Sequence, residues 1–405
     1  MKYFLTTICL ITGIVAFAQN TENEQKYRRS SLYSLMINHT DQKFASEIRN
    51  SFLNIPIPDK YNDHDLSVKV VDINTKLKNA SSNKENADIT TFLNDNQIAG
   101  RMVAKWFNRD KFTGACDMEL VKERGLYNAN EFDKQIAARS TRGISMLQDA
   151  GEDLIGNTFV LVNDISYVDK QKKGMIFGGI IKALGTVAQA YTGVNVTSAT
   201  NLIGDIAESI RGFSVKINTF LYKLSWNDEI ANNFYETQYT DSVDAGKAKN
   251  FEDNRGNYQL LYVGKVESSG STTSWLGVNL DTPENMVRKA CQRAIDENIV
   301  DLQTQFEEFR TKTPLLSIDP LTADIGMKEG VSKKSRFEVL DRVEQKDSTY
   351  KYVKVAEIEP VEDMIWDNRY MAAEEGAKGA NLGKTTFRKV KGGDIFPGML
   401  IREIK

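Results

Sequence analysis

The chain has 405 residues, of which 41% are hydrophobic and 26% are charged, which is ordinary for a soluble globular protein. The 52 basic residues (Lys and Arg) are balanced by 55 acidic residues (Asp and Glu), so the chain lacks the basic excess of a nucleic-acid-binding protein. We therefore expect no nucleic-acid partner.

The first 18 residues have the pattern of a secretory signal peptide. Lys2 precedes an apolar run that ends at Phe17 and closes on a small-x-small cleavage pattern, Ala-Phe-Ala. The run is too short to span a bilayer stably. Cys9 lies inside it and not just after the cleavage site, so we expect no lipid anchor. The pattern predicts an exported protein.

Residues 19–88 form the predicted N-terminal segment, which has patterns of a helix, a strand and a loop. Apolar residues recur every four positions from Phe44 to Phe52 and indicate a helix. Ser67–Ile73 alternates and predicts a strand. Leu77–Asp88 is rich in polar residues and predicts a loop.

Residues 89–313 predict a central domain of helices and strands. An apolar stripe predicts a helix over Ile89–Phe107, and a second long helix is expected over Asn130–Leu154. Between them, Asp117–Lys122 is expected to be a strand. Thr158–Val162 is continuously apolar, which favours a central strand buried on both faces.

The second half of this domain has a clearer pattern. Phe213–Trp226 and Tyr258–Ser268 predict strands, and Ser269–Ser274 predicts a polar turn. Asn285–Phe309 predicts a long amphipathic helix, with Thr282 as its N-cap.

Residues 174–212 are apolar and rich in small side chains, which allow two backbones to approach closely. They predict a helical hairpin. A hairpin buried in the protein and one that makes peripheral contact with a membrane both fit this composition.

The sequence pattern changes from mixed helices and strands to strands alone at Pro314–Pro320, which we expect to be a domain boundary. Residues 321–405 predict short alternating strands joined by glycine-rich loops such as Gly376–Gly383, a pattern that suits a small β-barrel. The predicted fold class is therefore α+β: a mixed sheet with packed helices, followed by a small C-terminal β-barrel.

The residues that usually carry catalysis are scarce. His39 and His64 are the only histidines, and neither belongs to a cluster with metal-ligand spacing. The sequence contains no nucleophile elbow and no phosphate-binding glycine motif. We expect a non-enzymatic protein without metal or cofactor, and a solvated loop around His64. A hydrolase that uses two carboxylates remains an alternative.

Cys116 and Cys291 are the only cysteines after the predicted signal peptide, and an exported protein could pair them. Cys291 falls in the apolar stripe of the last long helix, which also fits a core residue. The sequence leaves both readings open.

The most distinctive motif that we expect at the surface is Glu123-Arg124-Gly125-Leu126-Tyr127. A strand end with Glu123, Arg124 and Tyr127 before a turn could bind a partner. An ion pair that fixes the turn is the alternative.

The order of elements from Ile89 to Phe309 resembles the α/β domain shared by the curli secretion channel family and the N-terminal domain of the TolB family. The features that carry this resemblance are the strand end Val121–Arg124 and the long helix Asn285–Phe309. The curli channel family carries an N-terminal lipid-anchoring cysteine, which this chain lacks.

The tail looks like the C-terminal barrel of the flagellar T-ring protein FlgT family, which joins a TolB-like domain to such a barrel. This similarity rests on Lys328–Val331, Phe337–Leu340 and Gly392–Asp394.

Together these resemblances imply a periplasmic or outer-membrane-associated structural or assembly factor of a bacterial envelope. Its partners would be envelope proteins, with self-association as one form of assembly. A periplasmic module that binds a small molecule or a glycan, through the loop Gly376–Gly383, is the second hypothesis. The sequence names neither the partner nor the oligomeric state.

Overall fold

The structure, a computed structural model, describes residues 30–58, 61–73, 82–128, 151, 154–168, 210–275, 282–310, 312–344, 350–369, 372–374 and 376–404. Its N-terminal half contains β1 (Ser30–Ile37), α1 (Ala45–Leu53), β2 (Tyr61–Asp63), β3 (Val70–Val71), α2 (Ser82–Asp95), α3 (Ile98–Trp106), α4 (Glu119–Asn128) and β4 (Thr158–Tyr167). There follow β5 (Ile210–Leu224), α9 (Asp228–Thr237), α10 (Ala245–Asn254), the short 3₁₀ helix η4 (Arg255–Asn257), β6 (Leu260–Trp275), α11 (Pro283–Gln305) and η5 (Glu307–Phe309). The C-terminal part contains β7 (Thr313–Ile318), β8 (Leu321–Ala323), η6 (Met327–Glu329), β9 (Arg336–Glu344), β10 (Tyr350–Pro360), η7 (Glu362–Met364), β11 (Thr385–Gly392) and β12 (Leu400–Ile404).

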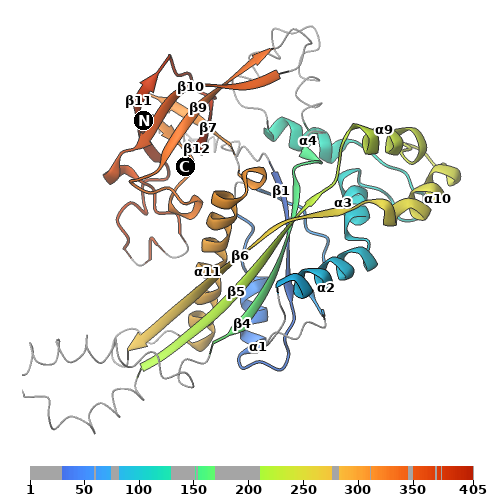
Figure 1. Cartoon of the computed structure of the whole chain (residues 1–405), viewed down its shortest axis with the longest axis horizontal. Helices are drawn as coiled ribbons and strands as arrows, with labels where there is room; N and C mark the ends of the chain where they lie inside the picture. The colour runs from blue at the N-terminus through green and yellow to red at the C-terminus, as the bar shows by residue number, and fades with distance from the viewer. Residues whose placement is uncertain are drawn as a thin grey trace, which may run out of the picture.

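A mixed sheet with packed helices organises the larger part of the molecule, as the sequence predicted (Figure 1). Its strand order is β2-β1-β4-β5-β6, and β3 also pairs with β1. β1 runs parallel to β2, β3 and β4, whereas β4, β5 and β6 are antiparallel to one another. The sheet therefore joins the N-terminal segment 30–73 to strands that follow much later in the chain.

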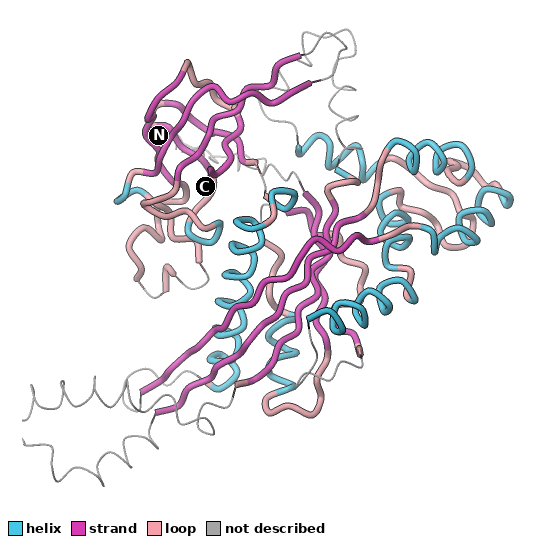
Figure 2. The backbone as a smooth tube through the Cα atoms, in the orientation of Figure 1, coloured by secondary structure: helices cyan, strands magenta, loops and turns pink. Residues whose placement is uncertain are grey.

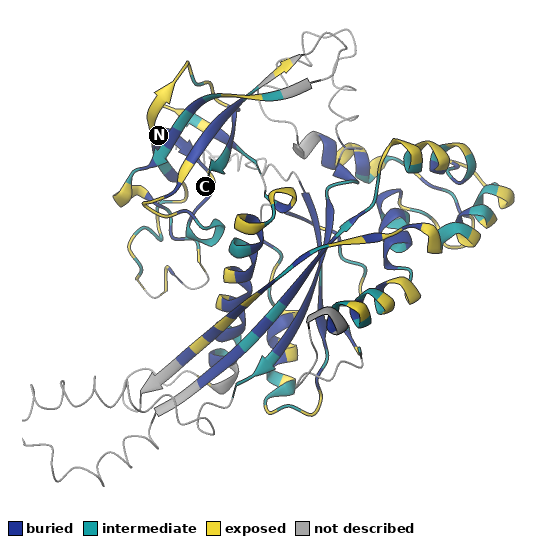
Figure 3. Cartoon of the chain, viewed as in Figure 1, coloured by how far each residue is buried: buried dark blue, intermediate teal, exposed yellow. Residues whose placement is uncertain are grey.

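Each face of the sheet carries its own hydrophobic core. Val160 and Val162 of β4 pack with α2, α3, α9 and α10, and Phe159 and Leu161 pack on the other face with α1 and α11. This alternation follows from the two-residue repeat of a strand. β4 is buried on both faces because helices cover both (Figure 3), and this confirms the central strand expected at Thr158–Val162.

α11 begins where the sequence predicted. The Thr282 hydroxyl accepts a hydrogen bond from the backbone N–H of Asn285 at 3.2 Å, which caps the helix. Cys291 is fully buried in the core beneath it, and both Cys116 and Cys291 are free thiols. The disulfide reading is therefore wrong.

Several predicted elements differ from the structure. The expected helix Ile89–Phe107 is two helices, because Gln97 adopts a left-handed backbone with φ 49° between α2 and α3. α2 begins at Ser82, so the predicted loop Leu77–Asp88 is wrong in its second half. The expected strand Asp117–Lys122 is wrong, because α4 begins at Glu119 and the Asp117 carboxylate accepts a bond from the Glu119 N–H at 2.9 Å.

β6 continues through the expected polar turn Ser269–Ser274. The side chains on one side of this stretch face α11: the Ser268 hydroxyl donates to the Ala294 carbonyl at 2.7 Å, and the Thr272 hydroxyl donates to that of Met286 at 3.0 Å. Hydroxyl groups that bond helix carbonyls can be buried in a strand without leaving polar atoms unpaired. The polar composition therefore reflects close contact with a helix.

Six antiparallel strands of the C-terminal part hydrogen-bond in a closed ring, in the order β10-β11-β8-β7-β12-β9 (Figure 2). Its interior is apolar, with the rings of Phe337 and Phe387 5.3 Å apart. β7 already begins at Thr313, so the expected boundary segment Pro314–Pro320 is itself part of the ring. Gly376–Gly383 lies outside the strands, as expected.

The ring is tied to the end of α11 by polar contacts. Arg310 donates to the carbonyl of Gln303 at 3.0 Å, and also to that of Glu403 in β12 at 3.4 Å. Arg402 of β12 forms an ion pair with Glu307 at 2.9 Å. The predicted signal peptide 1–18 and most of the predicted helix Asn130–Leu154 lie outside the described residues, as does the predicted hairpin 174–212 except for its last three residues, which belong to β5.

Candidate docking site

The structure separates the residues of the predicted partner motif. Glu123 lies on α4 with its side chain exposed, whereas Arg124 is only 5% exposed. The side chain of Tyr127 lies outside the described residues. Of the two placed side chains, only Glu123 faces solvent.

Arg124 belongs to a buried network beneath β1 and α3. Its guanidinium donates to the Ser31 hydroxyl at 3.0 Å and to the His64 Nδ1 at 2.7 Å, and it stacks over the Trp106 ring at 4.4 Å. Burial and the nearby Arg124 hold the pKa of His64 well below its usual value. His64 is therefore neutral, and its Nε2–H donates to the Met102 carbonyl at 3.0 Å. The expectation of a solvated loop at His64 is wrong.

A surface loop held by internal hydrogen bonds connects α3 to α4. Its centre is Asp110, whose carboxylate accepts bonds from the backbone N–H groups of Phe112 at 2.8 Å and Thr113 at 2.7 Å. The Thr113 hydroxyl donates to the same oxygen at 3.0 Å. These bonds favour the charged carboxylate, so the pKa of Asp110 lies below its usual value. The loop conformation is therefore fixed by the side chain at its first corner.

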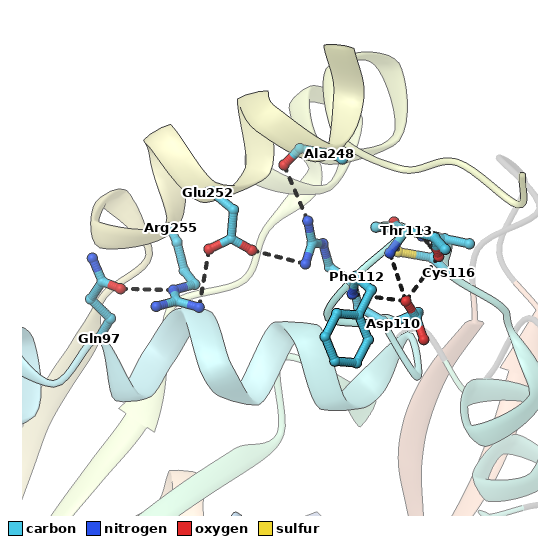
Figure 4. Close-up of polar contacts among 11 residues, drawn as sticks. Gln97, Asp110, Phe112, Thr113, Cys116, Ala248, Glu252 and Arg255 are labelled. Atoms are coloured by element: carbon cyan, nitrogen blue, oxygen red, sulfur yellow. Dashed lines mark hydrogen bonds and ion pairs between the residues drawn. The ribbon is translucent and has the colours of Figure 1, made fainter. Parts of the chain in front are cut away.

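The base of the loop is clamped onto α10 (Figure 4). Arg109 pairs with Glu252 at 2.9 Å, donates to the Ala248 carbonyl at 3.1 Å and stacks over the Phe251 ring at 4.4 Å. Glu252 also pairs with Arg255 at 3.2 Å, so one carboxylate holds two arginines. The clamp joins two segments that are far apart in the sequence.

Gly114 allows the close approach of this loop to α10. Its φ is +74°, and a Cβ there would lie 2.4 Å from the Cβ of Ala248. A residue with a side chain would be strained in that backbone conformation and would clash with the helix. The Cys116 N–H then donates to the Thr240 carbonyl at 2.7 Å and closes the loop.

Phe112, at the tip of this fixed loop, is 98% exposed, and no contact drawn in Figure 4 reaches its ring. Val243, in the loop before α10, is 75% exposed. The two loops meet through the Cys116–Thr240 hydrogen bond. We define the docking loop as residues 109–116, with Phe112 at its tip, together with the neighbouring exposed residue Val243. A large apolar side chain held in water on a fixed backbone is suited to insertion into an apolar pocket of a partner.

No family model matches this chain, and no curated protein matches it either.

A second polar cluster lies under the first turn of α2. His39 Nε2 and Asp164 Oδ1 are 2.7 Å apart, and the carboxyl group of Glu85 hydrogen-bonds to Asp164 and pairs with Lys265 at 3.4 Å. Burial, followed by the bond to Asp164, raises the pKa of Glu85 to about 7. This is an acid pair, but neither carboxyl group lines the cavities described in this molecule.

The described residues contain no group of three His, Cys, Asp or Glu side chains placed to hold a metal ion. Within the same part of the chain, no helix combines the length and apolar character needed to cross a bilayer.

The sequence carries one signal for the docking loop that hydrophobic periodicity does not detect. Asp110 precedes Phe112 by two residues and Thr113 by three, which is the spacing of an aspartate-capped turn. The exposure of Phe112 could not be read from this spacing, because it depends on where α10 packs.

Proposed function

We propose that this chain is a non-enzymatic structural or assembly factor of a bacterial envelope, exported to the periplasm and acting through protein–protein contacts. The observation that carries the proposal is the docking loop, which presents Phe112 at 98% exposure on a backbone fixed by Asp110. The predicted signal peptide supports the location. The resemblance to envelope assembly families supports the class of partner.

The docking loop has the energetic features of a binding anchor. Burying an exposed phenylalanine side chain contributes roughly 1.5–3 kcal/mol. Because the hydrogen bonds to Asp110 and the Arg109–Glu252 clamp already order the loop, little conformational entropy is lost when a partner binds. The partner in this proposal is a protein with an apolar pocket.

The test is crosslinking in the native host, followed by affinity capture of the full chain carrying Phe112→Ala. We expect at least about a tenfold loss of the captured envelope partner, because anchor residues of this kind dominate interface energies. The free energy of unfolding should stay within about 0.5 kcal/mol of wild type, since the side chain makes little contact with its own protein. Phe396→Ala is the matched control, because Phe396 is also an exposed phenylalanine, at 52%, on the ring.

Three outcomes would overturn the proposal. One is equal capture by wild type and Phe112→Ala. Another is a wild-type chain that crosslinks to nothing and remains a monomer in light scattering. The third is sedimentation of the chain with protein-free lipid vesicles that is lost in Phe112→Ala, which would make the loop a membrane anchor.

A further inference from the structure

A cleft of about 350 Å³ lies between α11 and the C-terminal ring. One wall is α11, with Glu297 and Val300, and the other is η6 and the loop after η7, with Lys328 and Arg369. Cavities of a few hundred cubic ångströms are the usual size for small-molecule sites. α11, which forms one wall of the cleft, lies away from α10 in the molecule (Figure 1).

Some of the charged groups in the cleft are already engaged. Arg369 holds Asp367 through two bonds, at 2.8 Å and 2.7 Å. These bonds keep the pKa of Asp367 below its usual value. Asp296 accepts a bond from the Gln292 amide at 3.0 Å, and Arg293 makes contacts of its own. These four charged residues therefore already have interactions of their own.

Glu297 and Lys328 differ from the other charged groups. Among the described residues, the Glu297 carboxylate and the Lys328 ammonium each lack an ion-pair partner. They line the same cleft from opposite walls, yet they do not approach each other within 4 Å, the distance at which an ion pair is counted. Two opposite charges that face one cavity without meeting leave room for a ligand that carries both complementary charges.

We propose that this cleft binds a small zwitterion, such as an amino acid or a short peptide. Its ammonium group faces Glu297 on α11, and its carboxylate faces Lys328 on η6. Val300, Met327 and Ala377 supply the apolar surface for the aliphatic part of the ligand. This ligand site goes beyond the proposed assembly function, and each can fail without the other.

The test uses the purified full chain after removal of the predicted signal peptide. Thermal-shift assays and calorimetry are run with glycylglycine and with each common L-amino acid, at concentrations up to about 10 mM, above the dissociation constant of a weak small-molecule site. Acetate and methylamine serve as probes that carry only one of the two charges. A zwitterion that binds the folded chain should raise Tm, whereas neither single-charge probe should do so.

Glu297→Gln and Lys328→Gln should each weaken binding of the zwitterion by about tenfold or more, because each removes a charge-assisted contact. The matched controls are Glu362→Gln and Lys333→Gln, which change an exposed ion pair, 3.0 Å long, elsewhere on the ring. The controls should bind as wild type does. Circular dichroism of all four variants separates lost binding from lost folding.

The proposal is overturned if no zwitterion shifts Tm of the wild-type chain. It is also overturned if acetate or methylamine alone binds as well, or if the two cleft variants bind as tightly as the controls.

Discussion

Glu85 and Asp164 bring two carboxyl groups together in a buried position, with residue exposures of 7% and 1%. The Oδ2 atom of Asp164 is buried and accepts no hydrogen bond from the other described side chains. Burial is the main cause that raises the pKa of Glu85 to about 7, and the hydrogen bond that its protonated carboxyl group makes to Asp164 adds to the effect. His39 contacts Asp164 and Lys265 pairs with Glu85, so each acid also has a basic neighbour.

This pair predicts a pH dependence of stability. The pKa of Glu85 is about 7 in the folded chain and 4.5 in the unfolded chain, so the folded state holds the proton more tightly. The stabilisation is fully present below the unfolded value and is lost as pH rises through the folded value. The loss is at most about 3 kcal/mol. Glu85→Gln keeps a hydrogen-bond donor without a charge, so its stability should fall less over this range.

Urea unfolding between about pH 4.5 and pH 8, followed by tryptophan fluorescence, measures this effect. Glu267→Gln is the control, because Glu267 forms a half-exposed surface pair with Lys216. A Glu85→Gln profile that falls as steeply as wild type would show that the proton is held elsewhere.

At the scale of elements, the contact between β6 and α11 depends on glycine. A Cβ on Gly270 would lie 1.8 Å from the carbonyl oxygen of Ala290. Backbone atoms of a long helix cannot move aside as the end of a flexible side chain can. Gly264 similarly leaves space for the ring of Phe306, to which a Cβ would come within 2.0 Å.

Gly270→Val should therefore lower the free energy of unfolding by about 1–3 kcal/mol or more, because it forces α11 away from the sheet. The control is Ser269→Ala, since Ser269 is the exposed neighbour of Gly270 on the opposite face of β6. Chemical denaturation followed by circular dichroism measures both variants. Equal midpoints for the two would mean that α11 is not held by this contact.

These contacts also explain what could be predicted from the sequence at this scale. β4 and α11 were predicted correctly because their own side chains carry the pattern of burial and capping. The strand at Ser269–Ser274 could not be predicted, because its small polar residues suit close contact with α11, which packs against it, and do not show the usual pattern of a strand. The sequence of α4 lacks a clear helical period and so does not predict a helix, and the start of α4 is fixed by the carboxylate of Asp117.

At the scale of the whole molecule, Arg310 connects the sheet and the ring. It caps the carbonyls of Gln303 and Thr304 at the end of α11, and it reaches the carbonyl of Glu403 in the last strand. Because one side chain bonds to both parts, we expect the two parts to unfold together. Neither this coupling nor the cleft between α11 and the ring could be predicted, since both depend on how two separately patterned parts pack.

Arg310→Ala should weaken that coupling by about 1–3 kcal/mol, the range for lost bonds from a charged donor. In differential scanning calorimetry, a single transition in wild type should broaden or split in the variant. Arg388→Ala, which removes only a surface pair with Glu359, should leave the transition single. A variant that keeps the single transition at the wild-type midpoint would place the coupling at other contacts.

The position of β1 inside the sheet has a consequence for biosynthesis. β1 is synthesised well before its partner β4, since Ser31 pairs with Thr158, and β5, the antiparallel partner of β4, comes later still. Until those segments have been synthesised, the nascent chain carries an apolar strand that lacks its main neighbour. Pairing over such sequence distances is slow to form. The topology therefore delays completion of the sheet around β1 until the segment 158–167 has been synthesised.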